Sequence, residues 1–337
     1  MRLVRPLRCV VLSLACATAV GCGGDKSGIT GPKNPPSPNS VHLQSDAGDY
    51  IGGGQSYNYT QANAVIAVTA SGGHLSIGID GDQRWSGEFQ SPSSLNQLRP
   101  GDYTNLQRYP FNDPAQGGLS WSGEGRGCNT LSGSFTVDSV TYDTGNLTTI
   151  DLSFEQHCEG AAAALLGTIH WRSDDTTGPP GPVNPVPAGL WRPAPGSTPP
   201  SGSYVYLNSD AGDFIGAGQT YTYTPVNATI AVTANAGHLS ATVSGVEGWF
   251  GDFQAMSTLS QLAPGYYADL RRYPFHNPVK GGLDWFGEGR GCNTLLGWFA
   301  IDGVTYTNGN LTALDLRFEQ RCEGGTPALH GAIHWSG

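Results

Sequence analysis

Apolar and polar residues alternate along most of the chain, in short runs that turn residues interrupt. The runs at 63–70, 73–80 and 83–90 each place an apolar side chain at every second position, with Gly, Asn or Asp between them. A period of two is typical of a β-strand that buries one face, and no stretch sustains the period of a helix. Many short strands of this kind predict an all-β protein built as an antiparallel β-sandwich of jelly-roll-like type.

The same alternation assigns the side chains that form the core. In the first half of the chain the inward positions are Ala64, Ile66, Val68, Leu75, Ile77, Ile79, Trp85, Phe89, Leu119, Trp121, Leu131, Phe135, Val137, Ile150, Leu152, Phe154, Leu165, Ile169 and Trp171. The tryptophans belong to this set, so we interpret them as core residues rather than as platforms for a ligand.

A shift of 164 residues aligns 41–173 with 205–337 without a gap, and about 80 of the 133 positions are identical. A unit of this length is a duplicated domain, since solenoid repeats are far shorter. We therefore expect two tandem domains at 41–173 and 204–337. The linker at 174–203 holds nine prolines, and as polyproline II it would reach about 90 Å at ~3.1 Å per residue. Its apolar pair Leu190–Trp191 either docks on a domain or is an incidental exposed pair.

The first forty residues have the composition of a targeting segment and a tether. A basic start is followed by the apolar run 9–20, which is too short to span a bilayer, and then by Cys22. This resembles a bacterial lipoprotein signal, which implies a signal peptide at 1–21, lipid on Cys22 and a disordered tether at 22–40. The alternative is cleavage after Ala19, which leaves a secreted soluble protein with a free thiol at Cys22.

The net charge limits the partners. The formal charge is −10, and it becomes −13 when Arg2, Arg5 and Arg8 leave with the signal (−10 minus 3). A chain this acidic is not expected to bind nucleic acid or an anionic lipid surface. We expect membrane contact only through the lipid anchor.

Two motifs repeat in both copies: GEGRGCNT at 123–130 and FEQHCEG at 154–160, with counterparts at 287–294 and 318–324. The four cysteines that remain after processing allow three pairings, and the duplication selects one bridge per domain, Cys128–Cys158 and Cys292–Cys322. Export favours these disulfides. A metal–thiolate site is disfavoured, because Arg321 stands where the first copy has His157 and neither copy has a CxxC pair.

The charges of these motifs have two interpretations. Glu124 and Arg126, with Glu288 and Arg290 in the second copy, are interpreted as a structural arginine–carboxylate network that fixes a glycine-rich loop. The alternative is a glycoside hydrolase that uses Glu124 with Glu155, and Glu288 with Glu319, as acid and base. Carboxylates that could offer oxygens to Ca²⁺ are Asp46, Asp49, Asp210 and Asp213. They match no complete calcium loop, so no cofactor or metal is predicted.

The outward face is where the copies differ most. The changes from copy 1 to copy 2 are Ser86 to Phe250, Ser122 to Phe286, Ser134 to Trp298, Ser132 to Leu296 and Asp102 to Tyr266. Contiguous exposed apolar surface usually marks a contact site. Phe250, Phe286, Trp298 and Tyr266 are therefore candidate ligand-binding residues. The other interpretation is that Leu190–Trp191 or the first domain covers them.

The Cys-centred motif, continued by GNLTxxDLxFEQxCEG and ALxGxIHW, resembles a module repeated in exported bacterial proteins, often near immunoglobulin-like domains. The resemblance implies an exported all-β module and brings no catalytic residues with it. We expect a non-catalytic cell-surface lipoprotein whose duplicated modules bind a polysaccharide or a surface protein. A structural spacer of the envelope is the alternative, and a polysaccharide hydrolase is less favoured.

Overall fold

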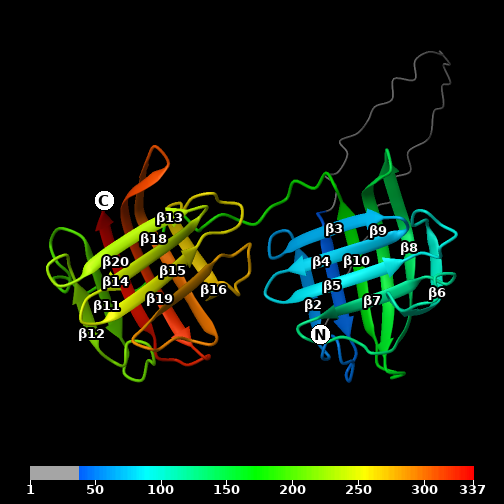
Figure 1. Cartoon of the computed structure of the whole chain (residues 1–337), viewed down its shortest axis with the longest axis horizontal. Coiled ribbons are helices and arrows are strands. Elements are labelled where there is room, and N and C mark those ends of the chain that lie inside the picture. The colour runs from blue at the N-terminus through cyan, green and yellow to red at the C-terminus, as the bar shows by residue number, and fades with distance from the viewer. Residues whose placement is uncertain (1–37) are drawn as a thin grey trace, which may run out of the picture. The chain divides into compact units, whose positions relative to one another are not determined.

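The computed structural model describes residues 38–337, and each copy of the repeat forms ten β-strands (Figure 1). The predictions of a signal peptide at 1–21, of lipid on Cys22 and of the disordered tether at 22–40 as far as residue 37 lie outside the described residues. The end of the predicted tether is wrong, because Asn39 is buried and hydrogen-bonded to Asp175 and Arg172, and β1 begins at Ser40. Within the described part of the chain, no helix is long and apolar enough to cross a membrane. The predicted all-β fold with two tandem domains is confirmed.

The strands of the two domains correspond one to one. In the first domain they are β1 (Ser40–Ser45), β2 (Ser56–Thr60), β3 (Val65–Ser71), β4 (His74–Asp80), β5 (Arg84–Gln90), β6 (Gly101–Arg108), β7 (Gly118–Gly123), β8 (Leu131–Asp143), β9 (Asn146–Cys158) and β10 (Leu165–Arg172). In the second they are β11 (Tyr204–Ser209), β12 (Thr220–Tyr223), β13 (Thr229–Asn235), β14 (His238–Ser244), β15 (Gly248–Gln254), β16 (Gly265–Arg272), β17 (Gly282–Gly287), β18 (Leu295–Thr307), β19 (Asn310–Cys322) and β20 (Leu329–Ser336).

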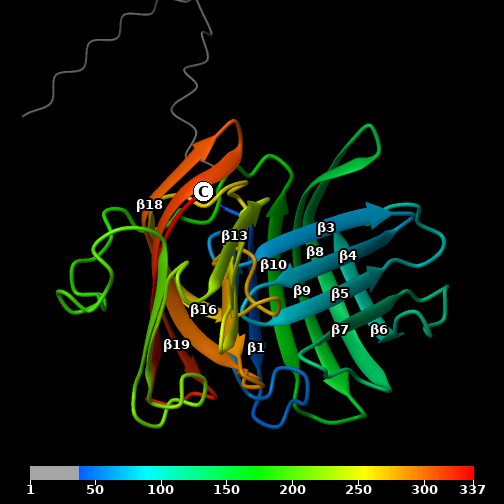
Figure 2. The same ribbon diagram turned by 60° about the vertical axis from the view of Figure 1, so that its left-hand side comes forward.

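Each domain is one continuous sheet folded into two layers. The strand order in the first is β2-β1-β10-β9-β8-β6-β7-β5-β4-β3, and the second repeats it. All pairs are antiparallel except β6 with β7 and its counterpart β16 with β17, which run parallel over only two residue pairs each. The sheet bends at this weak junction, so that β3, β4, β5 and β7 cross over β1, β10, β9 and β8 (Figure 2).

The core lies between the layers and contains the predicted inward residues. Phe89 of β5 meets Phe135 of β8 and Phe154 of β9 edge-on, with ring centres 5.4 and 5.5 Å apart. Trp121 of β7 is fully buried and stacks on Phe154 at 5.1 Å. Burying such rings removes a large apolar area from water, which stabilises the sandwich. Val68 and Trp171 are only partly buried, at the margin of the core.

A buried glutamine joins the layers where the sheet bends. Gln156 of β9 is fully buried. Its Oε1 accepts a hydrogen bond from Trp121 N at 2.7 Å, and its Nε2 donates to Trp121 O at 2.9 Å. One edge of β7 pairs with β5. At the other edge, the side-chain amide of Gln156 makes the two hydrogen bonds that a neighbouring strand would make. Gln320 does the same for Trp285 in the second domain.

Candidate functional site

Two disulfides fix the end of the β8–β9 hairpin in the first domain and the β18–β19 hairpin in the second. Cys128 is bonded to Cys158 and Cys292 to Cys322, each across a sequence separation of 30. The pairing predicted from the duplication is confirmed.

The Glu–Gly pairs that recur beside the cysteines in both copies form tight turns. Glu124 and Gly125 both have positive φ, 51° and 73°, as do Glu159 and Gly160 at 54° and 72°. A turn that needs positive φ at both central residues favours glycine at the second. The Glu124 carboxylate accepts a bond from Arg84 N at 2.8 Å. The Glu159 carboxylate accepts one from Asn129 N at 2.5 Å, which lowers the pKa of that carboxyl below its usual value.

The predicted arginine–carboxylate network is not what holds this loop. Among the described residues, no ion pair joins Arg126 to a carboxylate. Instead its Nε donates to Ile51 O at 2.7 Å, and its guanidinium lies over the Trp85 ring. Arg290 and Glu288 make the equivalent bonds, to Ile215 O and from Gly248 N. The motif is structural, but its charges bind backbone groups rather than each other.

The other carboxylates considered from sequence also have separate structural contacts. Glu124 lies in the turn after β7, whereas Glu155 lies on β9 in the other layer and contacts His157 at 2.7 Å. Asp49 is buried and accepts bonds from Ser45 Oγ and Gly52 N, each at 2.7 Å. The structure does not bring Glu124 and Glu155 together as an acid–base pair.

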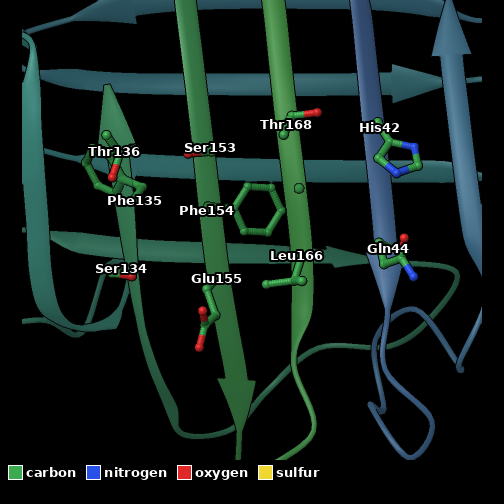
Figure 3. A pocket seen from close by; sticks show the side chains of 11 residues that line it. His42, Gln44, Ser134, Phe135, Thr136, Ser153, Phe154, Glu155, Leu166 and Thr168 are labelled. Atoms are coloured by element: carbon green, nitrogen blue, oxygen red, sulfur yellow. The ribbon is translucent and has the colours of Figure 1, made fainter. Parts of the chain in front are cut away.

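An open groove crosses the outer face of β1, β10, β9 and β8 in the first domain (Figure 3). We call it the outer groove; it has a volume of about 320 Å³, and its outward side chains include His42, Gln44, Ser134, Ser153, Glu155 and Leu166. Most of these outward side chains are polar, and Leu166 is an exposed apolar residue among them. The groove exists because serines occupy positions on β8 and β9 where the second copy has large side chains.

The same face of the second domain is filled. The strand registers show which larger residues replace those of the outer groove: Trp298 replaces Ser134, Arg317 replaces Ser153, His330 replaces Leu166 and Tyr206 replaces His42. Trp298 is only 9% exposed. The larger side chains occupy the space that is open in the first domain.

A segment of the linker lies against this filled face; we call residues 183–198 the linker strap. The Trp191 ring stacks on His330 at 4.9 Å and on Tyr206 at 6.4 Å, and its carbonyl oxygen accepts a hydrogen bond from Arg317. Upstream, Val183 forms an antiparallel bridge with Tyr266, with both N–H···O distances 2.9 Å. The docking alternative for Trp191 is confirmed, and this part of the linker is bound chain rather than free tether.

The four predicted ligand-binding residues thus fall into two groups. Tyr266 is bridged by the linker strap, and its ring meets Trp298, which is buried, at 5.8 Å. Phe250 and Phe286 lie on the other layer, on β15 and β17, where they pair in register and stack with centres 5.4 Å apart and planes inclined by 21°. Phe250 is 48% exposed. We call Phe250 and Phe286 the aromatic platform.

A depression of about 400 Å³ adjoins the aromatic platform, and Arg272 and Asp284 contribute to its wall. Asp284 Oδ2 accepts a bond from Arg272 Nε at 3.2 Å. The other oxygen, Oδ1, is buried and has no hydrogen-bond partner among residues 38–337. Burial raises the pKa of the Asp284 carboxyl, and the hydrogen bond from Arg272 offsets only part of that shift.

Asp284 was missed in the sequence. The first copy has Ser120 at this position, on the same outward phase as Ser122, so the difference between the copies was visible. The charge alone did not distinguish a solvated surface carboxylate from one that the fold buries.

Comparison of the chain with protein-family models, curated proteins and solved structures found no match.

Replacing Trp191 with alanine is expected to release the linker strap without unfolding either domain. The stacking on His330 and Tyr206 is lost, so the strap should open about tenfold more often and limited proteolysis between 183 and 198 should accelerate by a similar factor. Leu190→Ala, a neighbouring truncation with no ring contact, is the matched control. Equal cleavage rates in wild type and Trp191→Ala would show that the ring does not hold the strap.

Proposed function

We propose that the protein is a non-catalytic, exported surface lipoprotein whose second module binds a saccharide at the aromatic platform. One observation carries this proposal: Asp284, whose buried Oδ1 has no partner among residues 38–337, lines a depression beside two stacked rings, of which Phe250 is exposed and Phe286 is half-buried. Buried acceptors in native proteins are normally satisfied, so an unpaired one beside a pocket favours a ligand that donates a hydrogen bond.

Saccharides suit both parts of this site. The C–H face of a pyranose ring is apolar and flat enough to cover an exposed aromatic ring, and its hydroxyls donate to carboxylates. Arg272, already bonded to Asp284, offers further donors to ring or hydroxyl oxygens. The first domain has Ser86, Ser122 and Ser120 at the three positions, so the two modules are not equivalent in this respect.

A glycan panel probed with the full-length chain tests the proposal. Two variants install the residues that the first copy carries in the same fold. One is the double variant Phe250→Ser with Phe286→Ser, and the other is Asp284→Ser. We expect at least about tenfold weaker binding from each change, since stacking and the buried hydrogen bond are both lost. Val226→Ala, an exposed apolar residue elsewhere on the domain replaced by its first-copy counterpart, should leave binding unchanged.

Several results would contradict the proposal. If no glycan binds, or if the double serine variant binds as well as wild type, the platform is not a saccharide site. Turnover of a bound glycan would replace binding with hydrolysis. A stable assembly in sedimentation that the double serine variant disrupts would instead favour the alternative of an envelope spacer, with the platform buried between subunits.

A further inference from the structure

The outer faces of the two domains differ in a way that points to a second ligand. In the second domain an extended, proline-containing peptide, the linker strap, is seated on the face formed by β11, β20, β19 and β18. In the first domain the equivalent face carries the open outer groove. The fold therefore has a peptide-bearing surface, and only one of its two copies is occupied within residues 38–337.

The main chain of the linker strap meets the edge of β16 in a single antiparallel bridge. Tyr266 pairs with Ala300 of β18 on one side, and on the other its N–H and C=O bond to Val183. In the first domain Asp102 has the position of Tyr266 and pairs with Thr136 of β8. No segment of the described chain bridges to Asp102 from its other side. This part of β6 is a free edge, to which an extended peptide can add by main-chain hydrogen bonds.

The side chains define what such a peptide would carry. Ser134 leaves open the space that the Trp298 indole fills in the second domain, so the outer groove can accept a ring from a ligand. Leu166, 38% exposed, offers that ring an apolar contact. An aromatic side chain on the peptide would remove both surfaces from water.

The charges favour a basic peptide. In the second domain Asp302 binds Arg317 at 2.5 Å and Arg192 of the linker strap at 3.4 Å. The first domain retains the carboxylate as Asp138 but has Ser153 in place of Arg317, and no cation pairs with Asp138 in the part of the chain described. An arginine beside the aromatic residue of a ligand would meet an uncompensated carboxylate there.

We propose that the first domain binds an extended, proline-containing peptide of a partner protein by strand addition at Asp102, with an aromatic side chain in the outer groove and an adjacent arginine at Asp138. The strap sequence GLWRPAP at 189–195 has this chemistry. The linker strap is then a built-in ligand of the second domain, while the first domain stays open to a partner.

A dye-labelled synthetic peptide with the sequence of residues 183–198 serves as the probe, titrated with the full-length chain by fluorescence anisotropy. We expect saturable binding, weakened at least about tenfold by Ser134→Trp, because the new indole would fill the space that the ring of the probe enters. In the second domain, where Trp298 fills that space, Trp191 of the strap stacks on His330 and Tyr206 instead. Ser86→Phe, the matched serine-to-aromatic exchange on the opposite layer, should leave the affinity unchanged. A probe with alanine in place of the tryptophan should bind at least about tenfold more weakly.

A charge exchange provides a test that does not depend on filling the groove. Asp138→Asn should weaken binding of the original probe, but it should not weaken binding of a probe in which glutamine replaces the arginine. The affinity should therefore fall to the same value when the protein, the probe or both are changed. Absence of saturable binding, or equal affinity in wild type and Ser134→Trp, would overturn the proposal. So would concentration-dependent self-association that Ser134→Trp abolishes, because the occupant would then be the strap of a second copy.

Discussion

Replacement of Gln156 with leucine is expected to lower the free energy of unfolding of the first domain by about 3 kcal/mol. The side chain is fully buried and bonds both the N–H and the C=O of Trp121. Leucine has a similar volume and no polar atoms, so both backbone groups would stay buried without a partner. Each unpaired group costs about 1–3 kcal/mol.

Chemical denaturation followed by tryptophan fluorescence measures this effect, and the second domain, with Gln320 intact, is an internal reference. Gln107→Leu is the matched control, since Gln107 is exposed on β6. Gln156→Glu should also destabilise the domain, because a carboxylate cannot donate to Trp121 O. A loss below about 1 kcal/mol for Gln156→Leu would mean that the bend is stabilised by the core rings and not by this amide.

Removal of the disulfide from the first domain by Cys128→Ala with Cys158→Ala is expected to cost about 3–4 kcal/mol. The bridge closes a loop across a separation of 30 residues, and without it the unfolded chain gains the conformational freedom that the bond removes. The bridged hairpin also supports Glu159, whose carboxylate binds the backbone N–H groups of Asn129 and Thr130.

The second bridge, Cys292–Cys322, makes this measurement internally controlled. In the double alanine variant, the unfolding transition of the first domain should move to lower denaturant concentration, and that of the second domain should not change. Added reductant should then shift only the unfolding transition of the second domain. Cys128→Ala alone would leave a free thiol and is less informative. If both domains lose stability equally in the first-domain variant, the domains do not unfold independently, and the assignment of the bridge to one of them fails.

Under the two proposals the copies bind different ligands while they share the same core. Serine-to-aromatic exchanges on outward positions leave the inward alternation intact, so the duplicated fold tolerates them. In the second domain they produce the aromatic platform on one layer and a face closed by the linker strap on the other. In the first domain the same positions leave an open groove and a free strand edge. The binding of a saccharide and of a peptide can therefore be tested separately.

The sequence by itself determined the local and repeated features of this protein. Alternation of apolar residues predicts strands and their inward faces, because the side-chain period of a strand is two. Duplication selects the two disulfides, and the serine-to-phenylalanine exchanges predict where Phe250 and Phe286 face. These inferences need only a fixed period and a fixed offset of 164 residues.

Only the tertiary structure decided which groups meet across the fold. The sequence suggested an ion-pair network at Glu124 and Arg126, but hydrogen bonds to backbone groups of Arg84 and Ile51 hold both side chains. It left open whether Trp191 docks and gave no sign that Asp284 is buried. Each answer depends on contacts between residues distant in the chain, and the local pattern of a strand carries no information about what covers its outward face.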